Sequence, residues 1–247
     1  MDVRTYLDST YLKTNQQANV AEAENVLIVK SFVEEAILEH FKLIMIRPDQ
    51  VAMAKKMIQE AHSNLLVGTV IDFPKGQSDL ATKLAEAQQA ITDGADDLDF
   101  VCNYEAFKKG EIALVKEEIL KGTQLGLMHK KVVKWIIEVA ALNNGQIVQL
   151  SALIKNVVMQ NFKEDQYAAV FVKSSTGFYV TPNNEPNGAT VATIKIMLEN
   201  ASPLPIKAAG GVRNYADAVE MIQLGVQRIG TSGAKAIVDG ENTQNGY

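Results

Sequence analysis

Apolar, β-branched runs recur along the chain and alternate with segments of helical periodicity. Seven runs are clear, and their first residues lie about 23 to 37 positions apart. These runs begin near Phe41, Leu65, Asp97, Lys131, Ala168, Leu204 and Gln227. A weaker eighth run covers Arg4–Ser9 and precedes a helix-like stretch at residues 20–39. Short apolar runs of this kind predict buried strands, so the pattern predicts eight strand–helix units.

Two of the intervening segments carry clear helix signals. Residues 78–92 place apolar side chains on one face at steps of four, three and four. Residues 214–224 begin with Asn214 as a candidate N-cap and are followed by Gly225 as a stop. Strands that alternate with helices predict a parallel sheet with right-handed crossovers.

Eight such units in 247 residues match the usual size of a (β/α)8 barrel. We therefore predict one TIM-barrel domain over residues 1–247, with residues 239–247 as a flexible C-terminal tail. A doubly wound sheet is the competing fold. A dinucleotide-binding version of it would carry a glycine-rich turn after the first strand, and neither GxGxxG nor GxxxxGK[ST] occurs.

Composition narrows the classes of function. The chain has 24 basic and 29 acidic residues, so its net charge of −5 makes a nucleic-acid partner unexpected. No apolar run approaches the roughly 18 residues of a membrane helix, and the N-terminus lacks the features of a secretory signal. One cysteine, Cys102, and three histidines predict neither a disulfide nor a structural metal site. We expect a cytoplasmic protein without a membrane partner, a metal ion or an organic cofactor.

Polar residues that end the apolar runs are the candidates for chemistry, because TIM-barrel active sites lie at the C-terminal ends of the strands. Asp99, Lys134, Glu138, Lys173 and Lys207 occupy such positions, and Asp8 and Thr10 follow the weaker run near the N-terminus. A lysine there that snorkels to water, or pairs with Asp99 or Glu138, is the plainer interpretation of Lys173. Lys207, which ends the next strand, favours a reactive role instead.

Two neighbouring ammonium groups would change the chemistry of Lys173. At roughly 5 Å and an effective dielectric constant near 20, their repulsion is about 3 kcal/mol. This would lower the pKa of Lys173 from about 10.4 toward 8, before any effect of burial. A neutral amine can attack a carbonyl and form a Schiff base, and Asp99 could then transfer protons.

Glycine-rich turns follow the last three apolar runs and predict a phosphate site. Loops after strands 7 and 8 commonly bind phosphate in such barrels through backbone N–H groups and a helix N-terminus. Glycine lets the backbone approach the anion closely, and hydroxyl groups can add donors. A set of tight strand-to-helix turns is the alternative interpretation. The candidate residues are Gly177, Gly210, Gly211, Gly230, Thr231 and Ser232.

These motifs together resemble the deoxyribose-phosphate aldolases, a family of class I (Schiff-base) aldolases. The matching stretches, in chain order, are LDSTYLK (7–13), TVIDFPKG (69–76), GADDLDFVCN (94–103), KWIIE (134–138), FVKSSTGF (171–178), IKAAGGVR (206–213) and RIGTSG (228–233). The resemblance implies reversible cleavage of 2-deoxy-D-ribose 5-phosphate to D-glyceraldehyde 3-phosphate and acetaldehyde, without a cofactor. Dimerisation is common among such barrels, so a homodimer is a possible assembly.

The resemblance also implies a role for each matching residue. Lys173 would form the imine, and Lys207 would perturb it and assist proton transfer. Asp99 would donate and accept protons through a bound water. The glycine-rich turns would hold the 5-phosphate, and Tyr247, at the end of the tail, would fold over the site as a proton shuttle.

The sequence departs from the common family pattern at a few places. Asp72 and Lys75 stand where glycine and histidine are usual, Arg47 replaces an asparagine, and the loop at 181–188 is longer. Asp72, Arg47 and the loop could change substrate preference. Two other functions stay open: another Schiff-base aldolase or transaldolase that acts on a ketose phosphate, and a non-catalytic phosphosugar-binding barrel.

Overall fold

The eight strands form a closed parallel barrel. The structure, a computed structural model, describes residues 2–182 and 185–241. The strands pair in chain order, and β8 returns to pair with β1. They are β1 (Leu7–Thr10), β2 (Leu43–Ile46), β3 (Leu66–Ile71), β4 (Asp97–Val101), β5 (Val132–Ile136), β6 (Val170–Lys173), β7 (Ile206–Ala209) and β8 (Arg228–Thr231). The predicted (β/α)8 TIM barrel is confirmed, and the doubly wound alternative is wrong.

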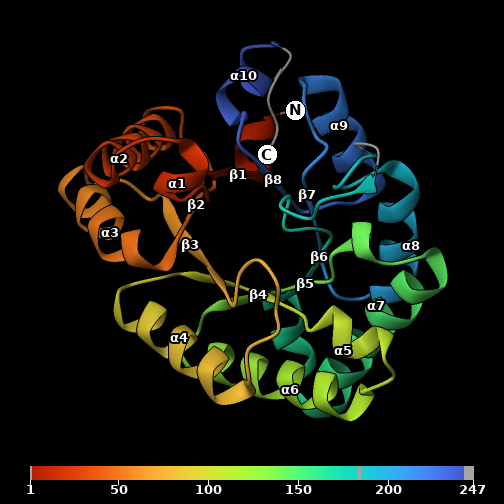
Figure 1. Ribbon diagram of the computed structural model, residues 1–247. Coiled ribbons are helices and arrows are strands. Elements are labelled where there is room, and N and C mark those ends of the chain that lie inside the picture. Colours follow the sequence, from red (N-terminus) through yellow and green to blue (C-terminus); the bar gives the residue numbers. More distant parts are fainter. Residues whose placement is uncertain (1, 183–184, 242–247) are drawn as a thin grey trace.

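Helices surround the barrel on all sides (Figure 1). They are α1 (Asn15–Ala18), α2 (Glu22–Leu38), α3 (Val51–Glu60), α4 (Leu80–Thr92), α5 (Tyr104–Lys108), α6 (Ile112–Met128), α7 (Asn144–Asn161), α8 (Val191–Ala201), α9 (Tyr215–Leu224) and α10 (Ala234–Val238). Short 3-10 helices occur at η1 (Val3–Tyr6), η2 (Pro48–Gln50), η3 (Val139–Ala141) and η4 (Glu164–Ala169).

Several strands begin later than the apolar runs suggested. The runs at Phe41, Ala168 and Leu204 start two residues before β2, β6 and β7, and the run at Arg4 starts three before β1. Before β1 and β6 the extra residues form η1 and η4. Hydrophobicity marks burial, and a buried turn that leads into a strand is as apolar as the strand itself.

The two predicted helix segments begin and end close to where their sequence signals lie. The Asp79 carboxylate caps α4 by accepting the N–H of Thr82 at 2.8 Å. Asn214 caps α9 through the N–H of Asp217, and Gly225 ends that helix in the left-handed conformation. Both ends follow the general preference for Asp or Asn at N-caps and Gly at C-caps.

One part of the core lies between the barrel and its outer helices. Trp135 of β5 stacks on Phe100 of β4 and donates its indole N–H to the Thr123 hydroxyl of α6. A side chain at Gly126 of α6 would overlap Val133 of β5, so glycine lets this helix approach the sheet closely. The fully buried indole therefore holds β4, β5 and α6 together.

The barrel interior is divided into an apolar side and a charged side. Leu43 and Met45 of β2, Val70 of β3 and Leu12, which follows β1, form a buried cluster. Gly68 leaves room there for the Met45 side chain. The charged side chains come from β4 to β8 and from β1, and they form the candidate site.

Three further features concern partners and the chain end. None of the helices within residues 2–182 and 185–241 is long and apolar enough to cross a membrane. In the same residues, no three His, Cys, Asp or Glu side chains gather as metal ligands.

Residues 239–241 follow α10, where Asp239 pairs with Lys235 at 2.9 Å. The cytoplasmic location stays a prediction, as does the tail, most of which lies outside the described residues.

Candidate active site

Lys173 ends β6 inside the mouth of the barrel. Its side chain is only 3% exposed, and its Nζ lies 2.9 Å from Asp99 Oδ2. The snorkelling interpretation is therefore wrong, whereas the ion pair with Asp99 is present. Strand register places Lys173 beside Lys207 of β7, so the expected pair of lysines is confirmed.

Asp99 is shared by three lysines. Its Oδ2 lies 2.9 Å from the Nζ of both Lys173 and Lys207, and its Oδ1 lies 2.9 Å from Lys134 Nζ. Burial alone would raise the pKa of this carboxyl, but the three ammonium groups lower it well below its usual range. Asp99 is therefore a carboxylate in the resting site.

The pKa of Lys173 is lowered to about 8. Burial is the largest cause, and repulsion from Lys207 and Lys134 adds to it, while Asp99 acts in the opposite direction. The expected value is thus reached by a different balance. Repulsion from Lys207 contributes less than burial, and the attraction of Asp99 opposes both.

Further charged side chains of the barrel interior contact Lys134 and Lys207. Lys134 Nζ also contacts Asp97 Oδ2 at 2.6 Å, and Lys207 Nζ contacts Asp8 Oδ2 at 2.6 Å. Arg228 of β8 joins Asp8 and Asp97 through its Nη2, at 2.6 and 3.2 Å. Asp8 and Lys134 are among the strand-end candidates from the sequence, which gave them no role, whereas Asp97 and Arg228 are not among those candidates. Strand alternation could have indicated Asp97, because it lies two residues before Asp99 on the same face.

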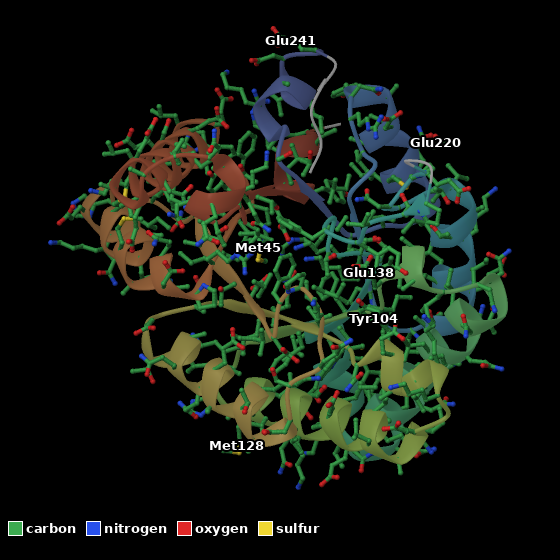
Figure 2. All side chains as sticks on the ribbon, in the orientation of Figure 1. Met45, Tyr104, Met128, Glu138, Glu220 and Glu241 are labelled. Carbon is green, nitrogen blue, oxygen red and sulfur yellow. The ribbon has the colours of Figure 1, made fainter. Side chains whose placement is uncertain are left out.

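Glu138 braces the loop that follows Lys173. This residue is 1% exposed, has a left-handed φ of 57°, and accepts hydrogen bonds from both the N–H and the hydroxyl of Thr176. Its other oxygen, Oε1, is buried without a hydrogen-bond partner, and burial raises the pKa of the carboxyl to about 7. Figure 2 shows Glu138 near Tyr104, inside the ring of helices. Burial, with the nearby Glu138 charge next, raises the Tyr104 pKa to about 12.

The predicted phosphate residues are only partly brought together. Gly177 and Gly210 both have positive φ, and Gly210 lies against Gly177 and Gly188. Gly211 is exposed and packs against the Ala189 carbonyl. Gly177 also lines a cavity of about 580 Å³ together with Lys13, Phe178, Tyr179 and Arg213.

The other glycine-rich turn has a different arrangement. Gly230 lies within β8 and faces the Lys207 side chain, where a Cβ would come within 3.1 Å of Lys207 Cε. The Thr231 hydroxyl accepts the N–H of Gly233 and donates to the Val212 carbonyl, and Ser232 is half-buried. Gly230 therefore makes room for a lysine of the site. This turn leads into the five-residue helix α10.

Three of the departures from the family pattern make contacts within the described residues. The Arg47 guanidinium covers the Phe73 ring at 4.9 Å and donates from Nε to the Leu12 carbonyl. Phe73 meets Phe178 edge to face at 5.0 Å.

Asp72 accepts both the N–H and the hydroxyl of Ser78, so its carboxylate holds its own loop together. In the longer loop, Asn187 donates to the Gly177 and Tyr179 carbonyls. Tyr247 lies outside the described residues.

Comparison with known proteins supports one family across almost the whole chain. Residues 5–238 match the model of the DeoC/LacD family aldolases. A deoxyribose-phosphate aldolase from Thermococcus gammatolerans is 34% identical over 241 residues, which cover 97% of this chain and 96% of that protein.

Two solved structures are similar in fold and sequence. One, named QR15, an aldolase, has a TM-score of 0.77 and 29% identity, with 97% of this chain and 95% of that chain covered. The other is a tetrameric deoxyribose phosphate aldolase from Aeropyrum pernix, with a TM-score of 0.76 and 27% identity over 96% and 90% of the two chains. The chain belongs to the DeoC/LacD family of aldolases.

Proposed function

We propose that this aldolase reversibly cleaves 2-deoxy-D-ribose 5-phosphate to D-glyceraldehyde 3-phosphate and acetaldehyde through an imine on Lys173. The observation that carries the proposal is the buried Lys173 amine, whose pKa is lowered to about 8, beside Asp99 and Lys207. Such an amine is partly neutral near neutral pH and can attack a carbonyl. The substrate in this proposal is that of the relatives, which are deoxyribose-phosphate aldolases.

Every covalent step of the reaction can take place on the single amine of Lys173. The neutral Nζ attacks C1 of the open-chain sugar, and loss of water gives an iminium. The C2–C3 bond then breaks, and its electron pair moves toward the iminium to form an enamine. C3 leaves as the aldehyde carbon of glyceraldehyde 3-phosphate after its hydroxyl loses a proton. Protonation at C2 and hydrolysis release acetaldehyde and the free amine.

Each proton transfer needs a group placed beside Lys173. The Asp99 carboxylate is ionised and lies 2.9 Å from the amine, so it accepts the proton first, directly or through a water. It becomes a donor in the return step. Lys207 lies the same distance from Asp99 and supplies a second proton carrier. The role of Tyr247 as a further shuttle stays a prediction from the family resemblance.

The 5-phosphate would bind at the cavity beside the loop that follows β6. Gly177 and Gly210 have the positive φ values that let a backbone fold around an anion. Gly211, Gly230, Thr231 and Ser232 are the other candidates from the sequence. Lys13 and Arg213 line the same cavity and supply positive charge.

Borohydride trapping tests this function. The protein is incubated with acetaldehyde, reduced, digested and mapped by mass spectrometry. We expect an adduct on Lys173. An adduct that forms with fructose 6-phosphate and not with acetaldehyde would favour a transaldolase-like reaction. Phosphosugar binding without any adduct would leave a non-catalytic barrel.

We also propose that the chain self-associates. The relative from Aeropyrum pernix is described as tetrameric. Leu38 and Met128 expose most of their apolar side chains on the helical surface. Sedimentation equilibrium would give the mass of the assembly, and a monomer at micromolar concentration would contradict this proposal.

A further inference from the structure

Six charged side chains form a closed ring across the barrel interior. In order they are Asp8, Lys207, Asp99, Lys134, Asp97 and Arg228, and Arg228 returns to Asp8. Signs alternate around the ring, and each group contacts both of its neighbours at 2.6 to 3.2 Å. Three cations face three anions, so the ring as a whole is neutral.

Lys173 lies outside this ring. Its ion pair is with Asp99, which already holds Lys134 and Lys207. When Lys173 is protonated, the described part of the barrel interior holds four cations and three anions. When Lys173 is neutral, the charges balance. Removing a proton from Lys134 or Lys207 would instead take one cation away from each of the two carboxylates beside it and leave the ring negative, and weakening buried ion pairs is costly.

We propose that Arg228 is a positioning residue that closes this charge-balanced ring and thereby makes Lys173 the cation that gives up its proton. The inference rests on the proposed function, in which Lys173 must be neutral to react. Arg228 acts from a distance, because its contacts in the ring are with Asp8 and Asp97.

Within residues 2–182 and 185–241, the strands on the other side of the barrel interior contribute apolar side chains around Lys173. β2 and β3 contribute the apolar Leu43, Met45 and Val70 to the interior, and β6 itself contributes Phe171, whose ring lies 5.9 Å from Lys134 Nζ. Glu138 is the remaining titratable group that faces the lysine, and it is held by Thr176. The ring and Glu138 are therefore the groups that set the charge state of Lys173.

The pKa directions agree with this division between ring and lysine. Burial opposes ionisation of Asp8 and of Lys134, but Arg228 and Lys207 still lower the pKa of Asp8, and Asp97 and Asp99 raise that of Lys134. Asp8 and Asp97 likewise raise the pKa of Arg228. The pKa of Lys173 is lowered instead. Burial and the positive charges of Lys207 and Lys134 lower it, and their sum exceeds the opposing effect of the Asp99 carboxylate.

The test compares Arg228→Met, Asp97→Asn and the double variant, with Arg228→Lys as the charge-preserving control. The readout is the rate at which acetaldehyde and cyanoborohydride modify Lys173, measured by mass spectrometry from pH 6 to 10. Acetaldehyde has no titrating group of its own, so the profile reports the enzyme. Modification of Lys56, whose side chain is 76% exposed, is the internal control.

Opposite shifts are expected from the two single variants. Loss of the Arg228 charge leaves the ring negative, so the pH at which Lys173 becomes reactive rises by on the order of one unit. Modification at pH 7 then slows roughly tenfold. Asp97→Asn leaves the ring positive and shifts the profile to lower pH. The double variant restores the balance and returns the profile toward that of the wild type, as does Arg228→Lys.

Other outcomes would contradict the proposal. A lower rate at every pH with an unmoved profile would make Arg228 a purely structural residue. Shifts in the same direction for both single variants would also overturn it. If Arg228→Met fails to fold, Asp97→Asn alone tests the sign. Wild-type protein without a Lys173 adduct would instead refute the proposed function.

Discussion

Glu138 and Thr176 are joined by two hydrogen bonds that connect the ends of neighbouring strands. The Glu138 carboxylate follows β5 and accepts the main-chain N–H and the hydroxyl of Thr176, which follows β6. The Thr176 hydroxyl also accepts the N–H of Phe178. Thr176 lies three residues after Lys173, so this link fixes the loop between the reacting lysine and the cavity lined by Gly177.

Glu138→Gln tests the buried carboxyl. Its pKa is raised to about 7 in the folded protein from a usual 4.5, so the folded state binds more protons between these values. Wild-type stability therefore falls as pH rises from 4.5 to 7, and the glutamine removes this loss. We expect the variant to gain up to about 3 kcal/mol relative to wild type between pH 5 and pH 8. Urea unfolding at both pH values measures the gain.

A difference that stays constant with pH would contradict this expectation. Glu111→Gln is a suitable control, because Glu111 is exposed and its substitution leaves the buried carboxyl in place. That variant should keep the pH dependence of the wild type.

Lys173→Met should abolish turnover and increase stability. The pKa of Lys173 falls from 10.5 to about 8 on folding, so the protonated lysine is destabilising below pH 8. This penalty disappears as pH rises from 8 to above 10.5. We expect the variant to be more stable than wild type by up to about 3 kcal/mol at pH 7, and by little above pH 10.5. Turnover and urea unfolding are measured on the same preparations, and wild-type turnover would refute the Schiff-base assignment.

Lys13→Met should weaken binding of the phosphorylated substrate selectively. Lys13 lines the cavity beside Gly177 and Arg213, so its charge is placed to attract a phosphate. We expect KM for the sugar phosphate to rise about tenfold, as for the loss of one favourable charge contact of roughly 1.4 kcal/mol. The rate of Lys173 trapping by acetaldehyde should not change. Lys116→Met, on the exposed face of α6, is the matched control. Equal loss with both substrates would contradict the phosphate role.

Gly126→Ala should destabilise the contact between α6 and the barrel. A Cβ at this position would overlap Val133, so the helix has to move away from β5. We expect a loss of about 1 to 3 kcal/mol in the free energy of unfolding. Gly145→Ala in α7 is the control, because the nearest atom to its added Cβ is 3.4 Å away. There the better helix propensity of alanine should add up to about 1 kcal/mol. Chemical denaturation of both variants gives the comparison, and equal effects would contradict it.

The sequence by itself determined the order of the elements and the three site residues Asp99, Lys173 and Lys207. Strand–helix alternation indicated the barrel, because burial of parallel strands makes them apolar at regular intervals. Asp99, Lys173 and Lys207 were found because each lies near or at the end of a strand, where parallel strands point their side chains into one mouth. The two ends of α9, Asn214 and Gly225, were predicted because helix capping is a local interaction.

Only the tertiary structure decided how the charges share partners. Arg228 and Asp8 lie 220 positions apart in the chain, and closure of the barrel is what joins them. The lowered pKa of Lys173 owes most to burial, which depends on every wall of the barrel at once. Gly230 turned out to make room for Lys207, because its direction follows from the strand register. Local pattern thus predicts which residues reach the mouth, whereas closure and burial determine which of them holds a proton.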